Sequence, residues 1–369
     1  MGILKRSGQS TVNLKYHRER LIGAVLQHKR SQALYQLEEN EIIEEIKKRG
    51  CTRVLLQMPE GLKQNAFTLA KFLEGETGVE VFVSCDPCYG ACDLALLPKK
   101  AINADLLVHV GHAEIPGEFT GENVVYVEAR ASVSIDEPMV QAIRMLETEH
   151  VIGLASNIQH IHQINRAKEI LEEHGKKVVI GRASGWLKYS GQVLGCDYGS
   201  LRAVAEKVDA IIVLSGGDFH ALGIPLATGK RTIVVDPFQN AARDMTGACR
   251  ILLRRRWIKI TQFKEAKKIG IIVGLKSSQM NVPVARRIKE MLEQKGYSTV
   301  LLCATEVMPE TLESFIDLDA FVEISCPRIS TDDQERYRKP ILNPEEVMIA
   351  LGKKQWEDYA KGMALEEWH

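Results

Sequence analysis

The chain has 369 residues, of which 45% are hydrophobic and 26% are charged, a balance that excludes a disordered or fibrous protein and predicts roughly two or three globular domains. Lysine plus arginine equals aspartate plus glutamate at 48 each, so no overall field attracts nucleic acid or an anionic membrane, and neither is an expected partner. The apolar runs are too short to span a bilayer and the N-terminus lacks the apolar stretch of a secretory signal, so a cytoplasmic location is expected.

The chain begins with a polar N-terminal extension over residues 1–35, followed by a helix expected over Leu37–Lys48. From residue 52 onward, runs of Val, Ile and Leu alternate with polar loops and amphipathic helices, a pattern typical of parallel sheets joined by crossovers. The pattern predicts opening strands at Val54–Gln57, Val151–Ala155 and Lys268–Val273, helices at Asn165–Glu173 and Val284–Gln294, and following strands at Val178–Ile180 and Thr299–Leu302.

One segment recurs three times, because ADLLVHVGH, VDAIIVLSG and LDAFVEISC align without gaps. The alignment superimposes Asp105, Asp209 and Asp319, and seven residues further on it superimposes His112, Gly216 and Cys326. Recurrence in the same order of elements favours a true triplication. We therefore predict an α/β fold of three related units over residues 36–145, 146–260 and 261–369, each a small parallel sheet flanked by helices.

A local basic patch interrupts the even distribution of charge at Arg250, Arg254, Arg255 and Arg256. Runs of charge of this kind usually lie on solvated faces. We expect these arginines to form the solvated end of a helix beside a linker.

Eight cysteines in a chain expected to be cytoplasmic point to metal binding or catalysis rather than to disulfides. Cys85, Cys88 and Cys92 lie together in VSCDPCYGACD, but no second CxxC pair exists to complete an ordinary structural zinc module. The CxxCxxxC run superficially reverses the CxxxCxxC motif of standard radical S-adenosylmethionine enzymes. From the residues alone, a complete local cluster site and one or two structural cysteines both remain open.

The other cysteines fall into two groups. Cys196, in QVLGCDYG, and Cys326, in EISCPRIS, lie near strand ends, where open α/β sheets build their sites. Cys51, Cys249 and Cys303 are expected to be buried or incidental thiols.

The ordered motifs MPEGL, CDPCYGACD, LLVHVGH, GRASGWLKYSGQVLGCDYG, GGDFHALG and ISCPRIS extend over almost the whole chain after the extension. With them the chain resembles the archaeal members of the diphthamide-biosynthesis family, the 2-(3-amino-3-carboxypropyl)histidine synthases. The resemblance implies that Cys92, Cys196 and Cys326, one from each unit, hold a central four-iron, four-sulfur (4Fe-4S) cluster. Three ligands would leave one iron open to substrate.

The resemblance also implies a reaction. One electron from the reduced cluster would cleave the Cγ to sulfur bond of S-adenosylmethionine, and the 3-amino-3-carboxypropyl radical would add to a histidine of translation elongation factor 2. Methylthioadenosine would leave in this first step of diphthamide biosynthesis. A homodimer and a separate electron donor are expected.

Polar residues after probable strands could contact S-adenosylmethionine. We predict this role for Asp218, His220, Gln239 and Arg328, with Arg182 and His112 as weaker candidates for the same cleft. The GLKSSQ segment after the third opening strand could bind an anion, but it lacks the Walker pattern and is interpreted as a turn.

Two other functions compete with this hypothesis. The chain could be a structural or electron-carrying iron–sulfur subunit that assists another catalytic subunit, although such a partner could have lost one of the three cysteines. An ordinary Rossmann dehydrogenase would need a GxGxxG loop after its first strand, and the sequence has none.

Overall fold

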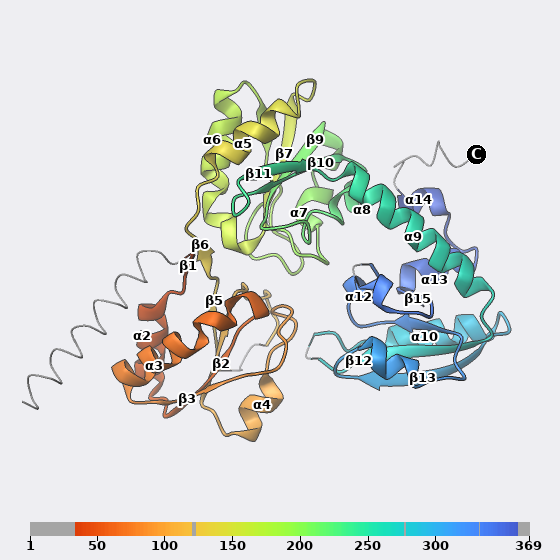
Figure 1. The fold of residues 1–369 in the computed structure, drawn as a ribbon, viewed down its shortest axis with the longest axis horizontal. Helices are drawn as coiled ribbons and strands as arrows, with labels where there is room; N and C mark the ends of the chain where they lie inside the picture. Colours follow the sequence, from red (N-terminus) through yellow and green to blue (C-terminus); the bar gives the residue numbers. More distant parts are fainter. Residues whose placement is uncertain (1–33, 120–122, 277, 332, 361–369) are drawn as a thin grey trace, which may run out of the picture.

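A computed structural model of the chain describes residues 34–119, 123–276, 278–331 and 333–360. Three α/β units form the corners of a triangle, with the first unit orange, the second yellow to green and the third blue (Figure 1). No helix within these described ranges is both long and apolar enough to cross a membrane. The architecture confirms the predicted class of several small parallel sheets flanked by helices.

The first unit contains a four-stranded parallel sheet in the order β3-β2-β4-β5. Its strands are β2 (Arg53–Gln57), β3 (Glu80–Val83), β4 (Leu106–Val110) and β5 (Val124–Val127). Its helices are α2 (Glu39–Arg49), the 3-10 helix η1 (Glu60–Asn65), α3 (Ala66–Thr77) and α4 (Leu96–Ala101). Two short strands, β1 (Tyr35–Gln36) and β6 (Arg130–Ala131), pair antiparallel beside the sheet.

The second unit extends the same plan to five strands in the order β8-β7-β9-β10-β11, of which only the last is antiparallel. Its strands are β7 (Val151–Ser156), β8 (Lys177–Val179), β9 (Ala210–Leu214), β10 (Arg231–Asp236) and β11 (Ala241–Asp244). Its helices are α5 (Asp136–Arg144), η2 (Ile158–Gln163), α6 (Ile164–Glu173), α7 (Gly199–Arg202), η3 (Ala205–Lys207) and α8 (Ile224–Thr228). Helix α5 belongs here because Met139 and Ala142 pack into this unit's core.

The third unit repeats the four-stranded order as β13-β12-β14-β15, all parallel. Its strands are β12 (Lys268–Gly274), β13 (Ser298–Ala304), β14 (Ala320–Glu323) and β15 (Ile341–Leu342). Its helices are α9 (Thr246–Lys264), α10 (Val282–Glu293), α11 (Pro309–Glu313), α12 (Pro327–Thr331), η4 (Gln334–Arg336), α13 (Pro344–Ala350) and α14 (Trp356–Ala360). Helix α9 runs from the second unit into the third, through the predicted boundary near residue 260.

The three aligned aspartates perform the same task in each sheet. The carboxylate of Asp105 accepts the backbone N–H groups of Thr52 and Arg53 at 2.7 and 2.9 Å, at the start of β2. Asp209 accepts two backbone N–H groups in the same way at the start of β7, and Asp319 does so at the start of β12. All four of these distances are 2.8 Å. These hydrogen bonds lower the pKa of all three carboxyl groups. The shared contact strengthens the case for a triplicated unit.

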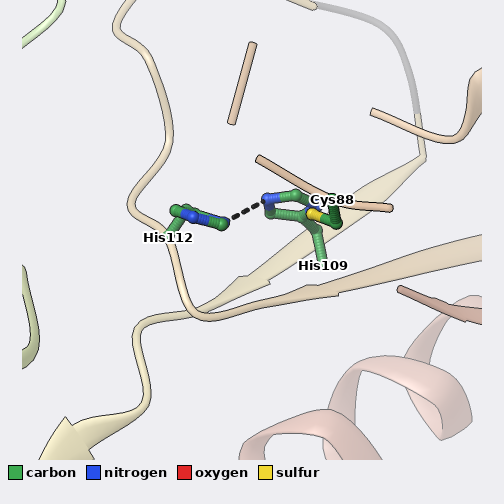
Figure 2. A group of neighbouring side chains, drawn as sticks. All are labelled: Cys88, His109 and His112. Carbon is green, nitrogen blue, oxygen red and sulfur yellow. Dashed lines mark hydrogen bonds between the residues drawn. The ribbon is translucent and has the colours of Figure 1, made fainter. Parts of the chain in front are cut away.

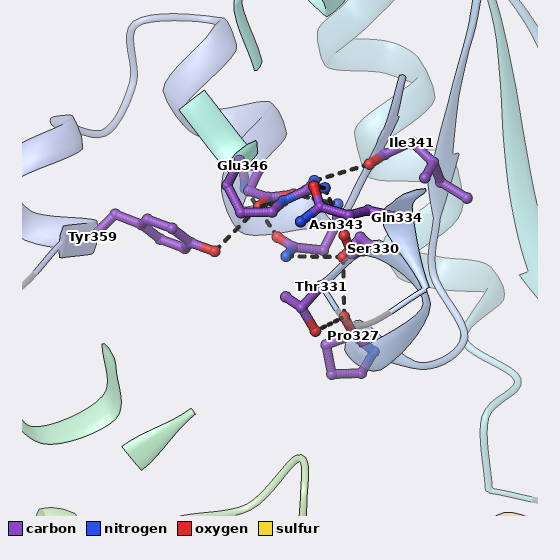
Figure 3. A network of polar contacts seen from close by, with 9 residues as sticks. Pro327, Ser330, Thr331, Gln334, Ile341, Asn343, Glu346 and Tyr359 are labelled. Carbon is purple, nitrogen blue, oxygen red and sulfur yellow. Dashed lines mark hydrogen bonds and ion pairs between the residues drawn. The ribbon is translucent and has the colours of Figure 1, made fainter. Parts of the chain in front are cut away.

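The prediction that the basic patch is a solvated helix end is wrong for Arg256. Arg250, Arg254 and Arg255 are exposed on α9, but the Arg256 side chain is fully buried. It lies at helical spacing with Leu252, Leu253, Ile260 and Phe263 on the face that packs into the core. The buried guanidinium is part of a polar network that extends to α12, η4, β15 and α13 (Figure 3).

Candidate metal centre

Three cysteines lie in loops that follow strands of three different sheets. Cys92 lies between β3 and α4, and Cys196 lies between β8 and α7, so both occupy the loop after the second strand of their units. Cys326 instead follows β14, the third strand of its unit. All three are therefore on the carboxyl side of parallel strands, where such sheets build their sites.

The electrostatics show that the three thiols converge. Burial, together with negative charge on Cys92 and Cys326, raises the pKa of Cys196 to about 12. Burial likewise raises the pKa of Cys326 to about 12, with Glu323 and Cys92 contributing. The pKa of Cys92 is also raised, mainly by burial. The structure thus brings together one thiol from each unit although 104 and 130 residues separate them in sequence.

The segment interpreted as a turn contacts Cys92 directly. The Gln279 side-chain amide lies 3.5 Å from the Cys92 sulfur, and the Ser278 N–H donates to the Cys92 carbonyl at 3.3 Å. The Gln279 contact lowers the pKa of the Cys92 thiol against the larger effect of burial. Nearby, Lys276 forms a 2.8 Å ion pair with Asp93. Sequence reasoning missed Lys276 and Gln279, because only the folded third unit brings them to the first.

The Cys326 loop is held by a buried carboxylate. Glu323, at the end of β14, accepts the backbone N–H groups of Ser325 and Cys326 at 3.1 and 3.0 Å. Gly274 permits this loop to approach β12, because a Cβ atom at that position would lie 2.5 Å from the Ser325 Cβ. The turn that presents Cys326 is therefore specified by residues on both strands beneath it.

Arg328 connects the third unit to the loop that carries Cys196. Its guanidinium donates to the carbonyl of Gly195 at 3.2 Å and to that of Phe219 at 2.6 Å. It also lies over the Phe219 ring, 4.2 Å from the centroid. The structure thus places this predicted substrate contact beside two of the three cysteines, where it bridges their loops.

Replacing Arg328 with methionine is expected to loosen the contact between the Cys196 and Cys326 loops, because two carbonyls lose a charged donor at a cost of about 1–3 kcal/mol. Iron retained after gel filtration of reconstituted protein should fall, with Arg328→Lys intermediate. Arg336→Met is the control, because the side chain of Arg336 pairs with Asp333 in an exposed position. Equal iron in the Arg328→Met and Arg336→Met proteins would contradict the bridging role.

Two of the other predicted substrate contacts are joined by an arginine that sequence reasoning did not select. Arg243, on β11, pairs with Asp218 at 2.6 Å and donates to the Gln239 side-chain oxygen at 3.2 Å. Little in the sequence indicated that Arg243 belongs to the site. It lies in an antiparallel edge strand and not in a loop after a parallel strand, where we expected site residues. Arg182 is exposed in the loop after β8.

His220 lies in the same region and contacts Ser215 and Phe219. Its Nδ1 atom lies 3.2 Å from the Ser215 hydroxyl, and its ring contacts Phe219 edge-on at a centroid distance of 5.0 Å. Burial, together with the charges of Arg328, His112 and His160, lowers the pKa of His220 to about 3. The imidazole is therefore neutral at physiological pH.

A neutral buried His220 makes stability depend on pH. Since its pKa is about 3 in the folded chain and about 6.5 when exposed, the unfolded state binds more protons between these values. Its stabilising effect is complete above about pH 6.5 and declines as pH falls toward 3, by about 2 kcal/mol at about pH 5. Urea unfolding of iron-free protein at about pH 7 and about pH 5 should show a smaller acid loss for His220→Gln. An identical loss in both proteins would contradict this.

A second group of possible metal ligands lies in the first unit. Cys88 follows β3, His109 is the last residue but one of β4, and His112 follows that strand. One ligand atom from each lies within 4.8 Å of the others. In Figure 2 the two imidazole rings meet nitrogen to nitrogen, with the Cys88 sulfur beside the His109 ring. Cys85, the remaining cysteine of the local run, is exposed.

The three convergent cysteines fit an iron–sulfur cluster. Burial and mutual repulsion both oppose three free thiolates, so a positively charged group is needed to hold them ionised together. Iron–sulfur clusters bind cysteine thiolates, and three thiolates on a four-iron cluster leave one iron without a protein ligand. The donor set therefore suits a cluster that binds substrate better than one that only carries electrons.

Comparison with known proteins agrees with this geometry. A family model described as "Putative diphthamide synthesis protein" matches residues 58–360. The chain is 37% identical to 2-(3-amino-3-carboxypropyl)histidine synthase of Pyrococcus horikoshii, covering 87% of this chain and 92% of that protein. It is 30% identical to 2-(3-amino-3-carboxypropyl)histidine synthase subunit 1 of Gallus gallus, covering 90% and 82%. The crystal structure of Dph2 from Pyrococcus horikoshii with a 4Fe-4S cluster superimposes with a TM-score of 0.80 at 35% identity, covering 89% of this chain and 94% of that one.

Proposed function

The chain belongs to the diphthamide synthesis protein family, and from this premise we propose that it is a 2-(3-amino-3-carboxypropyl)histidine synthase. The reaction transfers the 3-amino-3-carboxypropyl group of S-adenosylmethionine to a histidine of a protein, the first step of diphthamide biosynthesis. One observation carries the proposal: a chain similar to this synthase over 87% of its length brings a cysteine from each of three units to one place.

Cys92, Cys196 and Cys326 would hold the 4Fe-4S cluster. When bound, this group supplies one electron and an iron atom with an open coordination position. The protein's own contribution is to hold the three sulfurs and to restrict the orientation of the sulfonium, since geometry decides which of its bonds can be cleaved. Gln279, Glu323 and Arg328 serve this purpose, because each contacts a cysteine or the loop that carries it.

Asp218, His220, Gln239 and Arg328 are proposed to surround S-adenosylmethionine. Asp218 suits the substrate ammonium group, although it now pairs with Arg243, and the neutral His220 can accept or donate one hydrogen bond without adding charge. Arg328 already donates to two carbonyls, so a substrate carboxylate would have to share its guanidinium.

The remaining chemistry and partners follow from the family premise. The Cγ to sulfur bond breaks after uptake of one electron, methylthioadenosine leaves with the sulfur, and the carbon radical forms a new bond to an imidazole carbon. The substituted ring then releases that carbon's hydrogen as a proton to solvent and gives up one electron, for which the oxidised 4Fe-4S cluster would be the acceptor, and the imidazole is aromatic again. We propose elongation factor 2 as the source of the histidine, together with an external one-electron donor, a homodimer and a cytoplasmic location.

The test is to incubate anaerobically reconstituted protein with S-adenosylmethionine, a chemical reductant and archaeal elongation factor 2. Peptides of the elongation factor are then analysed by mass spectrometry. A 3-amino-3-carboxypropyl group on one histidine is the expected result. An elongation factor lacking that histidine is the control. An intact cluster with reductant but no modified histidine would contradict the proposal and favour an electron-carrying subunit.

A further inference from the structure

The group formed by Cys88, His109 and His112 is distinct from the three cysteines assigned to the cluster. His109 is fully buried, Cys88 is buried and His112 is half-buried. All three belong to the first unit, on the loops and the strand end around β3 and β4. Two imidazoles and a thiol at one buried point form a donor set that suits a transition metal.

The tautomer of His109 follows from its neighbour Gln57. The Gln57 side-chain amide donates to the Asp93 carbonyl at 2.7 Å, while its oxygen accepts the Ala95 N–H at 3.1 Å, so the oxygen and nitrogen positions are assigned by their partners. The same oxygen lies 2.8 Å from His109 Nδ1, which must therefore carry the proton. A histidine that ligates a metal characteristically donates its other ring N–H to an acceptor in this way.

The lone pair of His109 Nε2 consequently faces His112. The distance from His109 Nε2 to His112 Nδ1 is 3.0 Å, and burial lowers the pKa of both rings, that of His112 to about 4. Between these two nitrogens, two neutral imidazoles hold a single proton, which His112 Nδ1 donates to His109 Nε2. Two nitrogen ligands of tetrahedral zinc stand about 3.3 Å apart. A metal could therefore replace the shared proton after the two nitrogens separate by a few tenths of an ångström and the rings turn so that both lone pairs point at the metal, which lies beside the line between the nitrogens.

The charges around the group are mixed. Asp93 is near enough to Cys88 to disfavour a thiolate there and so to favour a cation beside it, while Lys276, paired with Asp93, has the opposite influence. A metal bound to the thiolate would resolve this conflict, because it brings the positive charge that ionised Cys88 lacks in this buried position.

We infer that Cys88 Sγ, His109 Nε2 and His112 Nδ1 bind one divalent zinc-type cation, at a site separate from the iron–sulfur cluster. Binding displaces the Cys88 thiol proton to solvent, and the His112 proton moves to Nε2, so the metal meets one thiolate and two neutral imidazoles. The fourth position of a tetrahedral ion is then filled by water.

The test uses the reconstituted holoenzyme, equilibrated with zinc and freed of excess by gel filtration, with zinc and iron measured in the same sample. Wild type and the matched control Cys85→Ser should retain about one zinc per chain. Cys88→Ser and His112→Gln should lose zinc and keep their iron. Gln57→Leu should weaken zinc binding by about 10- to 100-fold, because it removes the acceptor of the His109 Nδ1–H, together with the Gln57 hydrogen bonds to Asp93 and Ala95.

Three results would overturn the inference. The wild type could bind no zinc, the Cys88→Ser protein could keep its zinc, or the same protein could lose iron instead, which would make Cys88 a cluster ligand. Zinc-edge X-ray absorption adds a readout independent of activity and folding, since one sulfur and two imidazole nitrogens are expected. A sulfur-only environment would assign the zinc to the three convergent cysteines.

Discussion

Replacing Cys196 with alanine is expected to lower the iron bound by reconstituted protein, and the synthase activity with it, by more than the roughly 10- to 100-fold that loss of an outer-shell partner costs a metal site, because the change removes a ligand. The second unit contributes no other thiol to the converging group, whereas Cys92 and Cys326 come from the other two units. Two thiolates held by separate units cannot retain a four-iron cluster as three do. Cys92→Ala and Cys326→Ala should behave alike, and iron and sulfide analysis with the visible absorption spectrum measures the loss.

The matched control for these variants is Cys85→Ala, which removes an exposed thiol from the same loop as Cys92. It should retain its iron, and Cys88→Ala should also have a milder effect than the three cluster variants. Iron loss from Cys85→Ala and Cys88→Ala as severe as that from Cys92→Ala, with Cys196→Ala unaffected, would instead support a cluster held by the local CxxCxxxC run.

Replacing Arg256 with alanine is expected to reduce the free energy of unfolding by about 3–5 kcal/mol, the usual cost of leaving one partner of a buried ion pair alone. Arg256 and Glu346 are both fully buried, and their closest nitrogen and oxygen atoms lie 2.5 Å apart. The guanidinium also donates to the carbonyls of Ser330 and Ile341. Because α12 follows Cys326 directly, iron retention should fall together with stability.

Urea unfolding of the iron-free proteins measures this effect. The control is Arg255→Ala, one residue earlier on α9, whose pair with Glu335 is exposed and should contribute less than about 1 kcal/mol. The double variant Arg256→Met/Glu346→Leu should recover much of the stability, because replacing both members removes the unpaired charge. If Arg256→Ala and Arg255→Ala were equally stable, the network would not anchor the third unit.

Much of the fold could be predicted because short, fully buried strands leave a clear pattern. β9 is buried at every position, and its apolar run follows an aspartate that recurs ahead of β4 and β14. The burial of Arg256 could also have been predicted, since residues 249, 252, 253, 256, 260 and 263 follow helical spacing. The prediction of a solvated helix end instead relied on the neighbouring arginines.

The candidate site was less accessible to sequence reasoning. Cys92, Cys196 and Cys326 were selected through a family resemblance, since nothing in their local spacing indicates that they meet. Gln279 and Lys276 lie more than 180 residues from Cys92 and Asp93 in sequence, so only the packing of two units could reveal their contacts. His109 lay unnoticed inside a buried strand, although its spacing of three residues from His112 was a usable signal.

The most direct test of the proposed bond cleavage is nucleoside analysis of one anaerobic reaction containing reconstituted protein, S-adenosylmethionine and a reductant, run beside the Cys196→Ala protein. We expect methylthioadenosine from the wild type and almost none from the variant. Mainly 5′-deoxyadenosine would show that the other bond of the sulfonium is cleaved. Equal methylthioadenosine from both proteins would show that the three converging cysteines do not hold the reactive centre.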